Sequence, residues 1–316
     1  MKSPCFTLPD APDRRIIQSR PGPSGAGRTL LDYLAGRFDY RSREEWSAAL
    51  ARGEFSVNGA PASGEKFLDA EDVVEWFPGE IPEPEVDFSC RELYRDDHVL
   101  AVAKSGNLPT HPGGAYFRNT LWYRLRLRYG EIHPVNRLDR ETSGVVLLAL
   151  NSAAAARMQR FLPEMKKEYL LLVEGLWRGP EVVRISGWLR RDADSAVRKK
   201  QRLYPEPPGR EAVTEFRLLA VSGGVSKLAV RPLTGRTHQI RASALAAGYP
   251  VVGDKLYGVD ETLYLKQSRG ELTDADMVRL RMGRQALHAA SLEFPHPVTG
   301  EIIRVEAPEP GDFPAI

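Results

Sequence analysis

The sequence predicts an α+β protein of two domains, and three observations indicate this. Residues 78–85 contain three prolines among eight residues, a composition that opposes helix and central strand and favours an extended spacer. Residues 28–76 combine two helical patterns with a strand hairpin. Residues 145–150 are a short apolar run of Val, Leu and Ala, which is typical of a buried strand and too short to span a membrane.

The N-terminal third of the chain divides by composition. Residues 1–27 are rich in Pro, Gly and charge without periodicity, which predicts a flexible or loosely docked arm. Residues 28–77 form a module with helical spacing from Leu30 to Phe38, a second helix that begins after Ser42, and a turn at Asn58-Gly59. Residues 78–90 are the predicted linker, and residues 91–316 are the predicted larger domain.

Composition narrows the class of protein. The chain has 316 residues and a net charge of +2, and its only cysteines are Cys5 and Cys90. These two cysteines lack the density of a disulfide scaffold and the spacing of zinc ligands. No apolar stretch reaches about 18 residues and the N-terminus lacks an apolar signal core. We expect a cytoplasmic monomer without a membrane span, metal or cofactor.

The larger domain is predicted to contain a series of strands and a few helices. Residues 92–104 predict two strands joined by a turn at Asp96-Asp97-His98. Thr120 and Ser152 are predicted to begin helices, and residues 166–175 and 302–305 are predicted strands. Residues 212–220 and 226–232 predict a hairpin. Thr237 is predicted to cap a helix over residues 238–247.

The most informative stretch directly precedes the buried strand at 145–150. It reads Asn-Arg-Leu-Asp-Arg-Glu-Thr-Ser-Gly over residues 136–144. Asp139 stands between Arg137 and Arg140, and neighbouring guanidinium groups keep a carboxylate ionised and oriented. The spacing alone leaves open that Asp139 only pairs with arginine and ties down the loop.

Basic residues gather at 118–128, 190–202 and 231–241. Each cluster alone is compatible with a solvated surface, but together they flank the central motif and favour an anionic partner such as RNA. Residues 188–208 read as a loop or hairpin that faces RNA phosphates or is merely solvated. The third cluster contains Thr-Gly-Arg-Thr-His-Gln-Ile-Arg at residues 234–241.

These motifs resemble the RluA-type pseudouridine synthase family. Arg-Leu-Asp-Arg-Glu-Thr-Ser-Gly at 137–144 resembles its catalytic motif, and residues 92–104 and 234–241 resemble two further motifs in the same order. The resemblance implies a mixed, mainly antiparallel sheet and isomerisation of uridine to pseudouridine in ribosomal or transfer RNA. It implies that Asp139 is the catalytic carboxylate, that Arg241 pairs with it and that Tyr169 lies in the active site.

The same resemblance suggests residues that contact RNA. These are Arg137, Arg140, Lys104, Arg236 and His238. For Lys104 a purely structural position at a strand end, and for His238 a role in polar scaffolding, remain open. The helix–helix–hairpin order of residues 28–77 resembles the small S4-type RNA-binding domain. A plain structural module is the alternative there.

Two other functions compete with this hypothesis. An RNA-binding or RNA-folding factor, with catalysis secondary or lost, is suggested by the S4-like module and by Asn136 and Ser105, which depart from the family pattern. A glycoside-processing enzyme would use Asp139 and Glu141 as an acid pair. It requires two carboxylates about 5–9.5 Å apart across one sugar, which near neighbours in a loop rarely provide.

Overall fold

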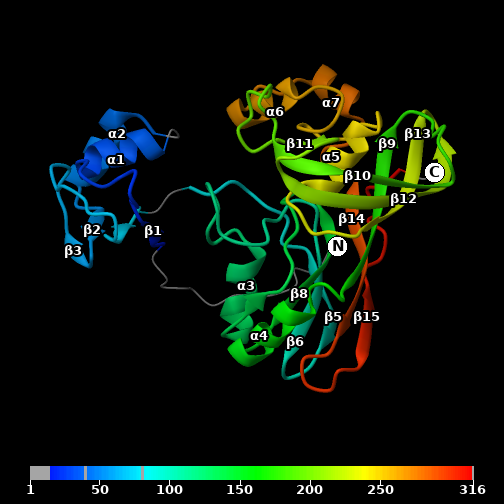
Figure 1. Ribbon diagram of the computed structural model, residues 1–316, viewed down its shortest axis with the longest axis horizontal. Coiled ribbons are helices and arrows are strands. Elements are labelled where there is room, and N and C mark those ends of the chain that lie inside the picture. The colour runs from blue at the N-terminus through cyan, green and yellow to red at the C-terminus, as the bar shows by residue number, and fades with distance from the viewer. Residues whose placement is uncertain (1–14, 39–40, 80–81, 315–316) are drawn as a thin grey trace. The chain divides into compact units, whose positions relative to one another are not determined.

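The computed structural model describes residues 15–38, 41–79 and 82–314. They form two compact units, and the division falls between Pro84 and Glu85, within the predicted linker (Figure 1).

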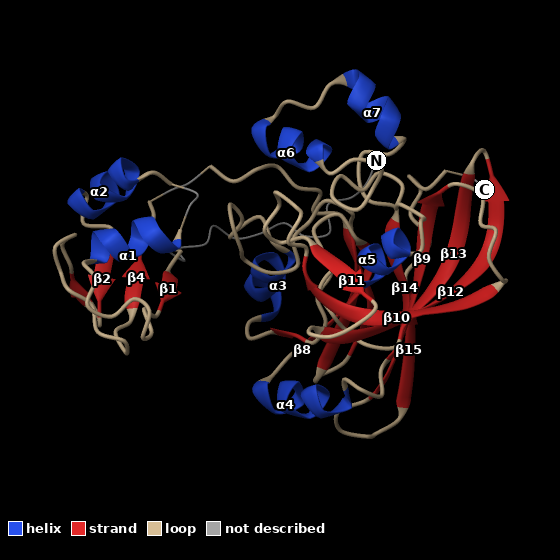
Figure 2. Ribbon diagram, turned by 45° about the horizontal axis from the view of Figure 1, so that its top comes forward, coloured by secondary structure: helices blue, strands red, loops and turns tan. Residues whose placement is uncertain are grey.

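The smaller unit is a four-stranded antiparallel sheet with two helices on one side of it (Figure 2). Its elements are β1 (Ile17–Ser19), α1 (Leu30–Arg37), α2 (Arg43–Ala51), β2 (Phe55–Val57), β3 (Ala60–Pro61) and β4 (Val74–Trp76), and the strand order is β1-β4-β2-β3. Trp46 of α2 packs against Trp76 of β4 with ring centroids 5.1 Å apart. Both rings are buried, so two tryptophans anchor helix to sheet.

Most of the predicted elements of this unit are confirmed. Ser42 begins α2 and forms a capping box with Glu45. Asn58 and Gly59 have φ angles of 53° and 78°, as a tight turn between β2 and β3 requires. Within the predicted flexible or loosely docked arm, Ile17–Ser19 form an ordered strand. This segment pairs with β4. The pairing uses backbone hydrogen bonds, which need no sequence periodicity, so the sequence did not reveal it. Residues 1–14 lie outside the described residues.

The larger unit contains an eleven-stranded mixed sheet. Its central path runs β11-β10-β12-β13-β9-β14-β8-β6-β5, while β15 pairs with β14 and β7 with β8. All pairings are antiparallel except that of β14 with β8. The strands are β5 (Cys90–Arg95), β6 (Val99–Lys104), β7 (His133–Pro134), β8 (Ser143–Ala149), β9 (Lys166–Glu174), β10 (Val182–Arg191), β11 (Gln201–Tyr204), β12 (Arg210–Ser222), β13 (Val225–Pro232), β14 (Leu287–Pro295) and β15 (Ile302–Glu306).

Five helices accompany this sheet in the described part of the chain. They are α3 (Leu121–Tyr129), α4 (Ser152–Phe161), α5 (Gln239–Ala246), α6 (Thr262–Arg269) and α7 (Asp274–Leu280). Thr120 caps α3 as predicted. Ser152 does not cap α4, because the side chain of Asn151 accepts the hydrogen bond from Ala154 N instead. Helices α6 and α7 were not predicted, although Thr273 and Asp276 form a capping box at the start of α7.

Strand β8 is the centre of the larger unit. All seven of its residues are buried. Val145 and Leu147 belong to one hydrophobic cluster, whereas Val146 and Leu148 belong to another. Because successive strand residues face opposite sides, β8 is packed on both faces, and such strands read as continuous apolar runs.

The pairing of β8 with β14 requires a glycine. Gly144 has a φ of +112°, and a Cβ atom at this position would lie 2.1 Å from the carbonyl oxygen of Ala289. A side chain would therefore collide with the backbone of β14. The loop that precedes β8 is held against a strand from the distant C-terminal region.

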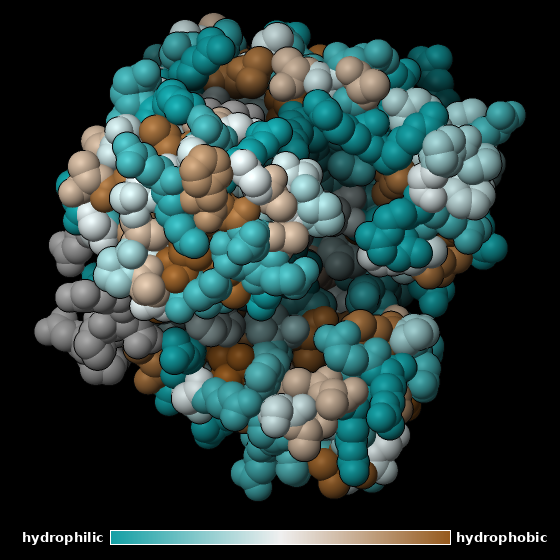
Figure 3. Space-filling model, turned by 60° about the vertical axis from the view of Figure 1, so that its left-hand side comes forward, coloured by the Kyte–Doolittle hydropathy of each residue, from teal (hydrophilic) through white to brown (hydrophobic). Residues whose placement is uncertain are grey.

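One face of the molecule is mostly polar. Hydrophilic residues cover most of the face drawn in Figure 3, and hydrophobic residues appear there in small separate groups. In the described ranges, no helix combines the length and the apolar character that crossing a membrane requires.

Candidate active site

Asp139 lies in the loop between β7 and β8, and the backbone of this loop is held on both sides of it. Before it, the hydroxyl of Thr110 accepts from Leu138 N at 3.1 Å and donates to Leu138 O at 2.8 Å. After it, the ammonium of Lys104 donates to Arg140 O at 3.2 Å. These contacts place the carboxylate at the start of a buried strand.

Asn136 has a structural role in the same loop. Its side-chain oxygen accepts from Leu147 N at 2.7 Å, and its side-chain nitrogen donates to Val145 O at 3.1 Å. Asn136 thus substitutes for a strand partner of β8. These two bonds tie the segment before Asp139 to β8.

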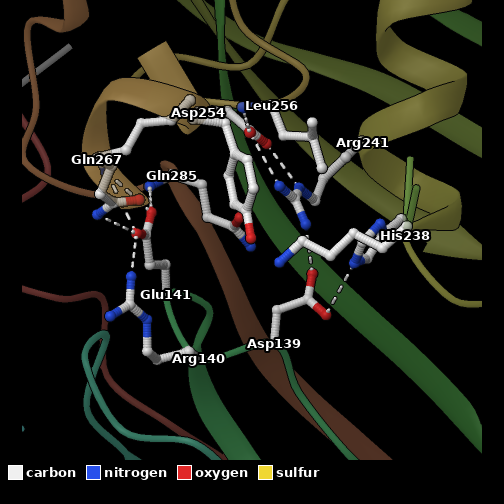
Figure 4. A pocket seen from close by; sticks show the side chains of 12 residues that line it. Asp139, Arg140, Glu141, His238, Arg241, Asp254, Leu256, Gln267 and Gln285 are labelled. Carbon is white, nitrogen blue, oxygen red and sulfur yellow. Dashed lines mark hydrogen bonds and ion pairs between the residues drawn. The ribbon is translucent and has the colours of Figure 1, made fainter. Parts of the chain in front are cut away.

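The structure brings Asp139 and Arg241 together, as the sequence analysis predicted. Arg241 Nη1 donates to Asp139 Oδ2 at 2.8 Å. The other side of the guanidinium is fixed by Asp254, which accepts from Nε at 2.6 Å and from Nη2 at 2.9 Å (Figure 4). Asp254 also accepts from the backbone nitrogens of Leu256 and Tyr257, both at 2.9 Å. A buried carboxylate therefore aims the guanidinium that contacts Asp139.

His238 and Tyr257 complete this side of the site. The Tyr257 hydroxyl accepts from Gln201 N at 2.7 Å and lies 3.0 Å from His238 Nδ1. If Tyr257 donates to Nδ1, the proton of the neutral imidazole is on Nε2, which lies 3.8 Å from Asp139 Oδ1. The face of the Tyr257 ring supports Arg241, whose guanidinium carbon is 4.6 Å from the ring centroid.

The backbone around His238 differs from the predicted start of a helix capped by Thr237. It precedes α5 in a left-handed conformation with φ of 59°, and no side chain caps the helix, so Thr237 is not the cap. A non-glycine residue in this region is uncommon and costs of order 1–3 kcal/mol. Its hydrogen bond with the Tyr257 hydroxyl, at 3.0 Å, fixes the side chain in this conformation.

The electrostatics favour an ionised Asp139. Burial by itself raises the pKa of this carboxyl, but the charge of Arg241 and its hydrogen bond outweigh burial and leave the pKa below its usual value. Burial lowers the pKa of His238 to about 4, so the imidazole is neutral at pH 7. Asp254 also has a lowered pKa, because Arg241 and two backbone N–H groups overcome its burial.

Tyr169 lies with Asp139 on the wall of a cleft of about 670 Å³. It belongs to β9, where it pairs with Val230 on one side and Ala289 on the other. Burial, and secondly the charge of Asp139, raise the pKa of its hydroxyl to about 12. This volume is typical of a pocket for a small organic group. The cleft therefore combines an aromatic face with an ionised carboxylate.

The residues predicted to contact RNA occupy different positions. Arg137 is exposed and lines the cleft, and Arg236 and His238 line it as well. Arg140 donates to the Tyr116 hydroxyl at 2.8 Å and to Glu141 at 2.9 Å, with its side chain one third exposed.

The position of Lys104 does not fit the predicted RNA contact. The residue is only 2% exposed, and its ammonium donates to the carbonyl oxygens of Ser105 and Arg140. It cannot reach a ligand from there and instead supports the loop that carries Asp139. Burial, followed by the charge of Arg284, lowers its pKa to about 7.

Glu141 does not form an acid pair with Asp139. Its carboxylate accepts hydrogen bonds from Arg140, from Lys255 at 3.1 Å and from the backbone nitrogen of Gln285 at 3.2 Å. These partners make it an anchor that ties the loop to the chain beyond α5. Among the described residues, no group of three or more His, Cys, Asp or Glu could hold a metal ion.

Comparison with known proteins identifies the class to which this fold and site belong. A family model described as RNA pseudouridylate synthase matches residues 98–246. Ribosomal large subunit pseudouridine synthase D of Xanthomonas campestris is 34% identical over 316 residues, covering 95% of this chain and 91% of that protein. Ribosomal large subunit pseudouridine synthase C of Escherichia coli is 32% identical, covering 90% of each.

A solved structure with the same fold is similar to this chain. Human RNA pseudouridylate synthase domain containing 1 is 29% identical, with a TM-score of 0.55 over 70% of this chain and 84% of that one. The class is that of isomerases that convert uridine in RNA. The chain belongs to the RNA pseudouridylate synthase family, as the motifs around Asp139 and Arg241 predicted.

Proposed function

We propose that this enzyme isomerises uridines of large-subunit ribosomal RNA and that Asp139 is its catalytic carboxylate. The observation that carries the proposal is the ion pair of Asp139 with Arg241 at the wall of the cleft. The names of the relatives favour ribosomal over transfer RNA. Action on ribosomal RNA would place a bacterial enzyme in the cytoplasm, and we propose that it acts as a monomer.

The reaction begins at the glycosidic bond of the target uridine. Ionised Asp139 acts either as a nucleophile at the sugar or as the base that starts cleavage. The N1–C1′ bond breaks, the uracil turns and a C5–C1′ bond forms; the proton on C5 leaves to solvent, and N1, no longer bonded to the sugar, takes up a proton. Substrate and product are isomers, so the step needs no donor group and no net oxidation.

The neighbouring residues have separate roles in this proposal. Arg241 keeps Asp139 ionised and oriented, and Tyr169 stacks on the displaced uracil. The raised pKa of Tyr169 keeps its hydroxyl protonated at pH 7, which favours stacking over action as an anionic base. Arg137, exposed on the cleft wall, fills the space that the everted base leaves in the RNA. Eversion costs roughly a few kcal/mol.

The smaller unit adds RNA contacts in this proposal, in the manner of an S4-type domain. Its two helices carry Arg37 and Arg43 at their ends, although Asp32 pairs with Arg43 at 2.7 Å. A chain that lacks residues 1–84 should retain chemistry on RNA fragments and lose affinity for long RNA. Equal affinity of both proteins for long RNA would argue for a structural module.

Release of tritium from RNA labelled at uridine C5 tests the function. Ribosomal and transfer RNA pools from cells that lack the enzyme are incubated with wild type and with Asp139→Asn, which keeps the shape of the side chain but removes its charge. We expect release from ribosomal RNA by wild type alone. Release from transfer RNA only would reassign the substrate, and release that persists in the variant would reassign the catalytic residue.

A further inference from the structure

A second hollow lies beside Asp139 and is not part of the cleft (Figure 4). It has a volume of about 140 Å³ and shares Asp139, His238 and Arg241 with the cleft. Its other walls include Lys199 from the connection between β10 and β11 and Tyr264 from α6. We call it the side chamber. Groups that are far apart in sequence meet there next to the reacting carboxylate.

The wall of the side chamber carries one positive charge in excess. It contains four cationic side chains and three carboxylates, with His238 neutral. Arg241 binds two of the carboxylates, those of Asp139 and Asp254. Lys255 and Arg140 bind the third, Glu141.

The cation that remains is Lys199. Among the described residues its ammonium has no carboxylate partner, and it lies 4.4 Å from the centroid of the Tyr264 ring. A cation held over an aromatic face keeps its charge available to an anion, because the ring carries no net charge. The Tyr264 hydroxyl likewise has no hydrogen-bond partner in the described ranges.

The segment that carries Lys199 is fixed in place by its neighbours. Lys200 Nζ pairs with Glu261, the residue before α6, at 2.5 Å. Ser195 donates to the same carboxylate at 3.1 Å, and Gln201 N donates to the Tyr257 hydroxyl. Lys199 is exposed but starts from an ordered backbone, which reduces the entropy lost when it binds a ligand.

We propose that the side chamber binds the backbone phosphate next to the everted uridine, with Lys199 as its principal cation. The inference rests on the proposed function, since it assumes that the target nucleotide occupies the adjoining cleft. A phosphodiester is a singly charged anion and matches the excess charge of the wall. It would fix the sugar relative to Asp139 while the base turns in the cleft. A free phosphate ion has related chemistry, and the experiment separates the two.

The test compares Lys199→Gln with Lys199→Arg and with Arg269→Gln. Arg269 lies on α6, has a side chain 64% exposed and is absent from both hollows, so it controls for general charge. KM and kcat for ribosomal RNA are measured by tritium release over a series of KCl concentrations. Each phosphate contact contributes roughly 0.7–0.9 to the slope of log affinity against log salt.

We expect Lys199→Gln to raise KM about fivefold, to reduce the salt slope by about one contact and to leave kcat within about twofold. Lys199→Arg should keep the wild-type slope, and Arg269→Gln should not change it. An unchanged KM and slope in Lys199→Gln, or an equal loss in Arg269→Gln, would overturn the proposal. Turnover by wild type, together with its loss in Asp139→Asn, tests the proposed function separately from the side chamber.

Inorganic phosphate distinguishes the source of the anion. At constant ionic strength it should inhibit wild type competitively with RNA, and Lys199→Gln should be less sensitive. If phosphate instead raises the Tm of wild type but not of Lys199→Gln, while both proteins have the same KM and salt slope for RNA, the chamber is a site for the free ion and the proposal is wrong.

Discussion

The substitution Asp254→Asn tests whether a residue that does not touch the cleft controls Asp139. Asp254 holds two nitrogens of Arg241 at 2.6 and 2.9 Å, and the two side chains are 1% and 8% exposed. Removal of one partner of a buried ion pair costs about 3–5 kcal/mol. Arg241 keeps its contact with Asp139, so we expect the lower end, about 3 kcal/mol. For a unit of this size that corresponds to a fall in Tm of roughly 6–12 °C.

Thermal unfolding and tritium release are measured on the same preparations at a temperature where each variant is folded. Without Asp254, Arg241 is no longer oriented, and a displacement of about 1 Å in a catalytic group can reduce the rate on the order of a hundredfold. Asp139→Asn is the matched control. It should lose activity but melt close to wild type, because Arg241 keeps both bonds to Asp254. An Asp254→Asn protein that melts and turns over like wild type would refute the reasoning.

Three further results are expected. The pKa of His238 is lowered from 6.5 to about 4, so between these pH values the unfolded chain binds more protons than the folded one. The free energy of unfolding should therefore fall as pH drops from 6.5 to 4, by up to about 1.4 kcal/mol per pH unit. Urea titrations should find a shallower fall in His238→Asn. Tyr169→Phe should keep its RNA affinity in a binding titration, whereas Tyr169→Ala should lose about 1–3 kcal/mol of stacking. Gly144→Ala should lower Tm strongly because its Cβ meets Ala289 O at 2.1 Å, while Gly130→Ala, with nothing within 4 Å, should cost only the strain of its φ of 78°.

The pairing of Asp139 with Arg241 was expected from the resemblance of their two motifs to the family, but the residues that hold Arg241 in place were not predicted. Asp139 and Arg241 stand in motifs with many polar residues at defined spacing, and the structure joins them. Asp254 stands between Gly253 and Lys255, and nothing in this local sequence marks it as the partner of an arginine on α5. The ring of Tyr257 under that arginine was missed for the same reason, because contacts between elements leave no periodicity.

The fold shows the same difference between local and non-local signals. Strand β8 was predictable because burial on both faces makes its sequence continuously apolar. Strand β1 was not, because three residues that pair with β4 carry no pattern of their own. The family resemblance suggested Lys104 as an RNA contact, with a structural position at a strand end as the alternative. Its burial beneath the loop depends on carbonyl groups of Ser105 and Arg140, which a sequence does not bring together.

The parallel pairing of β14 with β8 affects when the enzyme can become active during its own synthesis. Ser143, at the start of β8, bonds His288 of β14, which is 145 positions further along the chain. Ribosomes add about 5–20 residues per second, so the two strands leave the exit tunnel roughly 7–30 s apart. Until then the start of β8, at Ser143 and Gly144, lacks its partner on this side, whereas β7 can already pair with the end of the strand, and the loop of Asp139 lacks the support of β14. A nascent chain stalled before residue 287 should therefore be inactive, and chaperones have that interval in which to bind its exposed apolar strand.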